Sequence, residues 1–317
     1  MQADAVTAAL AELGHESMRL GCTLDLASAT ERLGQLAPDV VFNLVESLAG
    51  SDWLAGLVPA LLDSLRLPYT GSPTEATVLS THKLLAKERL AAAGLPTPAW
   101  FTVGQASRLA ESDRPEAWIL KTVTEHASFG LDEDGVVRGL TPEELARRLE
   151  EHARGLGRDC FAEAYIDGRE FNLSVLAGPD GPQVLAPAEI DFSAFPAEKP
   201  RVVGQRAKWA EGSFEFENTP RRFDFPAEDR PLLDELRRLA AAAWDLFRLA
   251  GYARVDFRVD LASRPWILEV NSNPCLSPDA GFAAALAQAR IPFPEAVRRI
   301  LDDAIRHGPP GRLAKGR

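Results

Sequence analysis

Cysteine is scarce in this sequence, and Cys22, Cys160 and Cys275 are the three among 317 residues. Three widely spaced thiols are not the pattern of a disulfide framework or of a cysteine-ligated metal site, and they fit a protein of the reducing cytosol. Long apolar runs and a cationic leader are missing as well, because no segment approaches ~18 uninterrupted apolar residues and the N-terminus carries acids. We therefore expect a cytoplasmic protein with no membrane partner.

An excess of positive charge is also missing. Lysine and arginine number 35 against 46 aspartates and glutamates, which gives a net charge of -11 and a pI near 5.1. General nucleic-acid binders and basic membrane-surface proteins need a cationic face, so the composition excludes both classes. A local basic pocket remains compatible with these numbers.

Several common site signatures are absent too. The sequence contains no G-x-x-x-x-G-K-[ST], G-x-G-x-x-G, H-E-x-x-H or G-x-S-x-G, and its five histidines are scattered. Carboxylates and lysines are therefore the candidate chemistry.

The first part of the chain alternates helical and extended patterns. Residues 5–14 and 27–36 have helical spacing, 17–24 has an extended pattern, and 38–45 is typical of a buried strand. This alternation predicts a small α/β unit with a parallel sheet over residues 1–75. Further along, the patterns predict a helix ending at Gly94 and a second, antiparallel or mixed sheet with a long helix over 229–250.

Two predicted strands near residues 252–259 and 265–271 carry charges where a buried strand should have none. Arg254 and Asp256 are two apart, as are Glu269 and Asn271, so each pair shares one face of its strand. Oxygen ligands of this kind suit Mg²⁺ that also takes phosphate oxygens. The alternative is a solvent face on which Arg254 neutralises the two carboxylates.

Three lysines are candidate phosphate contacts: Lys83 opens a helix, Lys121 ends an apolar strand, and Lys208 lies in a polar loop. Each alone is also compatible with a solvated surface lysine. Glu163 and Glu170 flank a Gly168 turn, where extended backbone and a carboxylate suit an adenine edge and ribose hydroxyls. The alternative for these two acids is an ordinary hairpin with both exposed.

Ordered motifs over roughly residues 38–305 resemble the ATP-grasp enzymes, specifically the D-alanine:D-alanine ligase-like branch. They are VPALLDSLRLPYTGS, HKLLAKERLAAAGLPTP, ILKTVTEHASFG, FAEAYIDGREFNLSVL, GQRAKW, GYARVDFRV, WILEVNSNP and IPFPEAVRRIL. The resemblance implies an α/β (α+β) ATP-grasp fold: an N-terminal α/β domain over 1–75, two subdomains over 76–167 and 168–307 that clasp ATP, and a disordered tail over 308–317. It also implies that the family's first N-terminal strand is missing.

The resemblance implies phosphate contacts from Lys83 and Lys121, with the loop around Ser128 folding over the phosphates. Lys208 resembles the lysine of a mobile loop that closes over the γ-phosphate. Arg254 matches the arginine that stabilises a tetrahedral intermediate, so Arg254, Ser128 and Lys208 are the expected catalytic residues.

The same resemblance implies how the nucleotide and the metal are held. Asp256, Glu269 and Asn271 match the Mg²⁺ ligands, with Mn²⁺ as an alternative ion. The residues that match the adenine and ribose site are Glu163, Ala164, Tyr165, Ile166 and Glu170.

Such enzymes phosphorylate a carboxylate with ATP and let an amine displace the phosphate, forming an amide. The resemblance therefore implies small-molecule carboxylate and amine substrates, amino acids or a peptide, and a homodimer. The departures lie on the amino-acid side: NLVESLAGSDW replaces an H-G-x-x-G-E-D-G segment, and NSNPCLSPDAG replaces N-T-x-P-G-x-T. Trp209 and Ala164 replace a usual tyrosine and a frequent lysine.

These departures favour substrates other than two D-alanines. Two alternatives remain open: a genuine D-alanine:D-alanine ligase with divergent substrate loops, and a non-catalytic nucleotide-binding regulatory module. The presence of Arg254 speaks against the module, because nucleotide binding alone does not require it.

Overall fold

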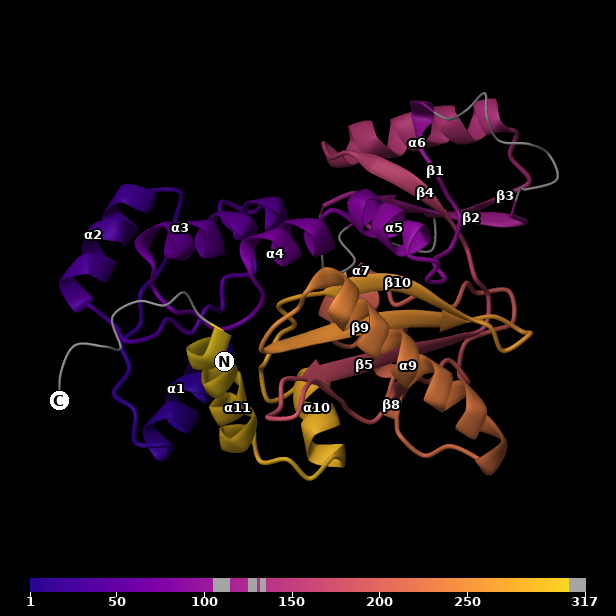
Figure 1. Cartoon of the computed structure of the whole chain (residues 1–317). Coiled ribbons are helices and arrows are strands. Elements are labelled where there is room, and N and C mark those ends of the chain that lie inside the picture. Colours follow the sequence, from indigo (N-terminus) through magenta and orange to yellow (C-terminus); the bar gives the residue numbers. More distant parts are fainter. Residues whose placement is uncertain (105–114, 125–129, 132–134, 308–317) are drawn as a thin grey trace.

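The computed structural model describes residues 1–104, 115–124, 130–131 and 135–307. A helical N-terminal unit lies beside two antiparallel sheets, one of four strands and one of six (Figure 1). Within the described residues no helix has the length and apolar character that a membrane crossing requires. The predicted disorder of 308–317 falls outside the described residues.

The N-terminal unit is mostly helical: α1 (Gln2–Glu12), α2 (Leu26–Leu36), the 3-10 helix η1 (Asp52–Gly56), α3 (Leu57–Leu65) and α4 (Thr74–Thr81). The strand predicted over 38–45 is wrong in extent, since its described pairing is one parallel bridge between Val41 and Tyr69. Polar side chains divert the backbone, because the Asn43 amide donates to Thr70 Oγ1 and the Val45 amide to Asn43 Oδ1. The predicted parallel sheet is thus reduced to this bridge.

The smaller sheet has the order β1-β4-β2-β3 and is antiparallel throughout. Its strands are β1 (Trp100–Phe101), β2 (Ala117–Thr122), β3 (Val136–Arg138) and β4 (Cys160–Ala164). Helix α6 (Pro142–Leu156) covers one face and begins with a capping box between Thr141 and Glu144. Leu145 and Leu149 of this helix pack on Trp118 and Leu120.

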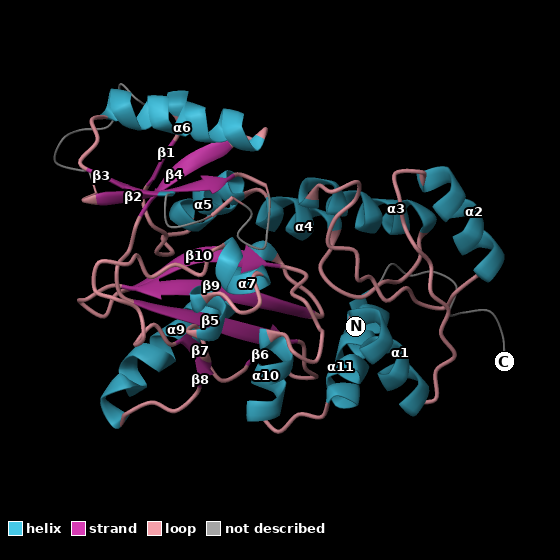
Figure 2. Cartoon of the chain, turned by 180° about the vertical axis from the view of Figure 1, so that it is seen from behind, coloured by secondary structure: helices cyan, strands magenta, loops and turns pink. Residues whose placement is uncertain are grey.

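The larger sheet has the order β10-β9-β5-β7-β8, with β6 also pairing with β5. Its strands are β5 (Arg169–Leu176), β6 (Gln183–Val184), β7 (Ala188–Ile190), β8 (Arg221–Arg222), β9 (Tyr252–Val259) and β10 (Pro265–Asn271). Helix α9 (Arg230–Phe247), which follows the short 3-10 helix η5 (Ala227–Asp229), covers one face, as the predicted long helix requires. Figure 2 shows α7 (Gln205–Trp209) over the opposite face.

Helix α5 (Lys83–Ala92) lies between the two sheets (Figure 1). Its Ala86 and Leu90 belong to the same apolar cluster as α9, and the helix stops just before Gly94, which has φ +70°. This confirms the predicted helix end. The remaining helices are α8 (Phe214–Glu217), α10 (Gly281–Gln288) and α11 (Phe293–His307). The domain limits at residues 75 and 167 stay predictions.

Candidate active site

The larger sheet has one apolar and one polar face. Asn172 lies opposite Asp256, and Ser174 lies opposite Arg254, while the residues between them belong to the core under α9. On β10, Glu269 pairs with Asp256 and Asn271 with Arg254. The strand register therefore brings the four predicted residues of the two strands onto one face.

A bulge in β10 makes this arrangement. Ile267 pairs with Phe257 on the core face, whereas Glu269 pairs with Asp256 on the polar face, so Leu268 is an extra residue between them. If β10 were regular and Leu268 paired with Asp256, Glu269 would point to the same side as Ile267, into the core. The bulge is adjacent to a contact from outside the sheet, because the Ile267 amide donates to the Pro96 carbonyl.

Arg254 and Asp256 form a two-bond ion pair, with Nε to Oδ1 and Nη2 to Oδ2 both at 2.7 Å. Asn172 also donates to Asp256 Oδ1 at 2.9 Å. Although burial lowers the pKa of Arg254, Asp256, Glu269 and Glu170 raise it above its ordinary value. Arg254 thus neutralises one of the two carboxylates, as the alternative of a solvent-exposed face requires. The pair is nevertheless largely shielded from solvent, because it lies on the polar face between the sheet and α7.

The donor chemistry fits a hard divalent cation. Asp256 and Glu269 are cross-strand neighbours, and Asn271 adds an amide oxygen one pair further on. The described residues contain no group of three His, Cys, Asp or Glu side chains that could hold a metal. The predicted set has two carboxylates and an amide, and leaves further positions to phosphate and water.

Lys83 and Lys208 interact with this cluster from two sides. Burial lowers the pKa of Lys83, while Glu269 raises it and Lys121 lowers it further. Burial and Arg254 lower the pKa of Lys208, against the opposing effect of Glu269 and Asp256. Glu269 is therefore shared between a lysine at the start of α5 and one on α7.

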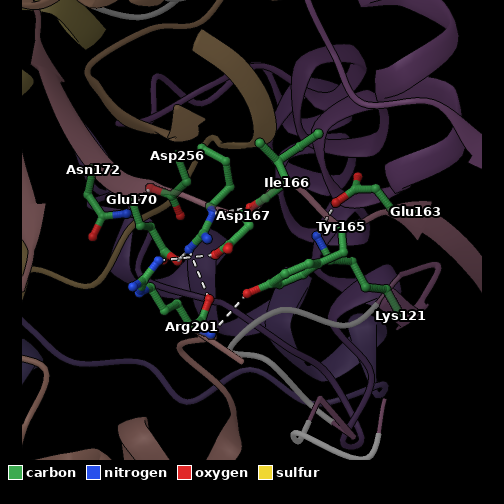
Figure 3. A network of polar contacts seen from close by, with 10 residues as sticks. Lys121, Glu163, Tyr165, Ile166, Asp167, Glu170, Asn172, Arg201 and Asp256 are labelled. Atoms are coloured by element: carbon green, nitrogen blue, oxygen red, sulfur yellow. Dashed lines mark hydrogen bonds and ion pairs between the residues drawn. The ribbon is translucent and has the colours of Figure 1, made fainter. Parts of the chain in front are cut away.

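The predicted hinge follows β4. Tyr165 donates its amide to the Ala117 carbonyl, and its hydroxyl accepts from the Arg201 amide at 2.9 Å (Figure 3). Arg258 Nε donates to the Ile166 carbonyl at 2.9 Å, and its Nη1 to Glu170 at 3.2 Å. The extended hinge is thus tied to β9 by one arginine.

The exposed-acid alternative for this hinge is wrong. The Glu163 side chain is 1% exposed and that of Glu170 is 14% exposed. Burial raises the pKa of Glu170, and Asp256 adds to this effect, while Arg258 and Lys208 oppose it. Both acids therefore lie inside the molecule, Glu163 against Lys121 and Glu170 against Arg258.

Three residues of the site region were missed by sequence reasoning. Lys87 is 1% exposed and pairs with Glu163; its place one helical turn after Lys83 was the available signal. Arg258 is 4% exposed, and its Nη2 has no hydrogen-bond partner in the described part of the chain. Alternation from Asp256 would have placed it on the polar face.

The third is Arg221 of β8. A methyl group on Gly281, at the start of α10, would lie 3.2 Å from Arg221 Nε, so the guanidinium covers this helix start. Partial desolvation and Arg254 lower the pKa of Arg221, and Asp279 opposes them. No motif in the sequence marks this residue.

Ser128 lies outside the described residues, as does the side chain of Trp209. A cavity of about 780 Å³ lies elsewhere, among Asp63, Trp244 and Asp303. None of the predicted site residues lines it, so its size gives no reason to move the site.

The loop after the predicted metal ligands is tied to the N-terminal unit. Asn273 Nδ2 donates to the Val45 carbonyl at 3.0 Å, and the Leu276 amide donates to Gln2 Oε1 at 2.6 Å. Gln2 in turn donates to Glu46, and Cys275 Sγ lies 3.3 Å from Ser277 Oγ. Both segments that depart from the resembled ligases therefore meet in space.

A family model described as D-ala D-ala ligase C-terminus matches residues 90–302. The chain belongs to this family. It is thereby an ATP-grasp ligase that forms carbon-nitrogen bonds with release of ADP, which confirms the resemblance seen in the motifs.

Relatives within the family match almost the whole chain. The D-alanine-D-alanine ligase of Moorella thermoacetica is 32% identical over 306 residues, which covers 95% of this chain and 92% of that protein. The ligase of a Synechococcus strain is 31% identical over 309 residues, covering 94% and 85%. An uncharacterized protein of Sinorhizobium fredii is 29% identical over 311 residues, covering 96% and 87%.

A solved structure confirms the fold class. The D-alanine-D-alanine ligase of Bacillus anthracis complexed with ATP superimposes with a TM-score of 0.70 over 96% of this chain and 91% of that chain, at 22% identity.

Proposed function

We propose that the chain uses ATP and Mg²⁺ to join a carboxylate to an amine through an acyl phosphate. The observation that carries this proposal is the single polar face on which Arg254, Asp256, Glu269 and Asn271 lie together, with Lys208 facing them. A ligase of this kind needs cations around a transferring phosphoryl group and a donor for an oxyanion. The face supplies both.

The nucleotide end of the site is assigned to the hinge. The backbone of residues 164–166 would hold adenine and Glu170 the ribose hydroxyls, while Lys83 and Lys121 would contact phosphate oxygens. Asp256, Glu269 and Asn271 would hold Mg²⁺, which supplies charge neutralisation to the phosphates when bound.

Arg254 has a second task besides its pair with Asp256. Since Nε and Nη2 contact Asp256, the Nη1 side of the guanidinium is the part assigned to the oxyanion that forms when the amine attacks. Lys208 on α7 would close the site over the phosphates and exclude water, which otherwise hydrolyses an acyl phosphate.

The substrates are proposed to be amino acids or a peptide other than a D-alanine pair. The support is the altered loop 272–281, whose Cys275 and Ser277 contact each other and whose backbone is held by Gln2. A site whose polar groups are arranged for one substrate rejects others strongly. The second candidate, a D-alanine-D-alanine ligase, is favoured by the names of the relatives.

The test is ADP release from ATP and Mg²⁺ over a panel of amino acids and small peptides, followed by mass spectrometry of the products. We expect a new amide product with an acceptor other than D-alanine, and little product with D-alanine. Efficient D-alanyl-D-alanine formation would promote the second candidate. ATP binding without ADP release for any panel member would favour the regulatory module. The predicted homodimer is checked by the mass in solution.

A further inference from the structure

Lys87 is a fully buried cation that no motif of the site explains. Its Nζ donates to Glu163 Oε2 at 2.7 Å and to Thr97 Oγ1 at 2.8 Å, and it lies 5.5 Å from the ring centre of Trp100. Two of the three N–H donors of the ammonium group are thus used in hydrogen bonds, and the Trp100 ring lies near its charge. Because its side chain is 2% exposed, Lys87 contacts Glu163 rather than a ligand.

Glu163 is held from both sides. Its Oε1 accepts from Lys121 and its Oε2 from Lys87, while the side chain is 1% exposed. Burial alone would raise the pKa of Glu163, but Lys121 and Lys87 together hold it below its ordinary value. The resemblance implied a direct contact of Glu163 with the nucleotide, but since both of its oxygens accept from lysines and its side chain is 1% exposed, we assign it an indirect action through Lys121.

The charges of this cluster determine what Lys121 can do. One carboxylate faces two ammonium groups, so the buried group carries a net charge of +1. Both lysines donate to this one carboxylate. Burial lowers the pKa of Lys87, Glu163 raises it, and the like charge of Lys121 lowers it again. Lys121 is the more exposed of the two, at 13% against 2% of the side chain. The surplus charge therefore faces the site at Lys121.

Lys87 also joins the two sheets. Its helix packs in the core under the larger sheet through Ala86 and Leu90, whereas Glu163 belongs to β4 of the smaller sheet. Thr97, which accepts from Lys87, donates to the Ile267 carbonyl of β10 at 3.0 Å. A buried ion pair of this kind is costly to break on one side only, because the remaining charge is left without a partner.

We propose that Lys87 is a positioning residue of the ATP site, which pairs with Glu163 so that this carboxylate does not hold Lys121 away from a phosphate group. Without Lys87, Glu163 would pair with Lys121 alone and hold its ammonium group away from the ligand. This inference rests on the proposed function, since it assumes that Lys121 contacts ATP.

The test compares ATP affinity in four proteins by calorimetry with Mg²⁺, together with KM for ATP and kcat. Lys87→Met keeps the length of the side chain without its charge, and we expect ATP affinity to fall about 10- to 100-fold, the loss typical of one charge-assisted hydrogen bond. The value of kcat at saturating ATP should change less than about threefold. Thr97→Val is the matched control, since it removes a contact of Lys87 without changing any charge, and its ATP affinity should stay within about threefold of the wild type.

The decisive variant is the double substitution Lys87→Met with Glu163→Gln. Removing the carboxylate frees Lys121 again, so ATP affinity should return to within a few-fold of the wild type, even though a second buried contact has been lost. A purely structural role predicts further loss or no recovery of affinity. Recovery supports the proposal; a Lys87→Met protein with wild-type affinity, or a double variant as weak as Lys87→Met, overturns it. A wild-type protein that does not bind ATP would refute the proposed function itself.

Discussion

Gly168, which connects β4 to β5, is the position where one added methyl group should damage the hinge most. Its φ is +141°, a conformation that residues with a Cβ rarely adopt. In Gly168→Ala, the new methyl group would lie 2.1 Å from the Val259 carbonyl oxygen, well inside the 3.0 Å that real Cβ contacts respect. Because the atom it meets belongs to the backbone of β9, a side-chain rotation cannot relieve the contact.

Two costs add in this variant. The unfavourable φ costs ~1–3 kcal/mol, and crowding of a packed site adds ~1–3 kcal/mol. Their sum is ~2–6 kcal/mol, which at about 2 °C per kcal/mol lowers Tm by roughly 4–12 °C. Since Ile166 and Glu170 each lie two residues away, a shift of the turn also moves the hinge, and KM for ATP should rise.

Gly181→Ala is the matched control for this experiment. Gly181 also has a positive φ, +119°, but a methyl group there has no atom within 4 Å. It therefore incurs only the conformational cost, and its KM for ATP should stay at the wild-type value. Thermal unfolding followed by circular dichroism, with an ADP-release assay, measures both quantities. Equal losses of Tm in the two variants, or an unchanged KM for ATP in Gly168→Ala, would refute the reasoning.

Four further outcomes are expected. Glu269→Ala should abolish ADP release in a protein that still folds, and wild-type ADP production would contradict the metal assignment. Arg254→Lys should slow turnover about 10²- to 10³-fold with ATP affinity within a few-fold; weak ATP binding at a normal saturated rate would move it to the nucleotide. Arg221 lies against the start of α10, beside the altered loop and within electrostatic reach of Arg254, so Arg221→Gln should lower kcat/KM for an amine that carries a carboxylate and leave KM for ATP unchanged; an unchanged kcat/KM in a substrate titration would contradict this. The hydrogen bond from Lys199 lowers the pKa of Glu215 to about 2, so the ionised Glu215 stabilises the fold fully above about pH 4.5 and progressively less as the pH falls towards 2. The Tm difference between wild type and Glu215→Gln should therefore shrink from about pH 4.5 to about 2. A difference that stays constant over this range would contradict the assignment.

Local signals in the sequence account for the elements that pack without outside help. Helix α6 begins at the capping box of Thr141 and Glu144, and α9 has an apolar stripe that the sheet covers, so both were predictable. The loss of the strand expected over 38–45 was not predictable, because strand formation depends on a partner strand and on where the polar groups of Asn43 and Thr70 bind. Pattern alone does not contain either fact.

Lys87 shows the same limit for the site. A lysine on a helix is usually solvated, and here it is buried only because α5 lies between two sheets that are distant in the sequence. Its partner Glu163 is 76 residues away. The sequence marks which residues have the chemistry, but the buried lysine that shares Glu163 with Lys121 follows from tertiary packing.

The bulge at Leu268 shows the same dependence on tertiary contacts for the proposed metal ligands. Glu269 and Asn271 share a face because they lie on the same side of the bulge, so counting by two was correct for them. Counting by two from Ile267 would have placed Glu269 in the core. The Ile267 amide donates to the Pro96 carbonyl, and we infer that this backbone contact holds the bulge in place. The direction of Glu269 therefore depends on a contact with a residue distant in the sequence, which helps to keep Ile267 in the core while Glu269 lies on the polar face.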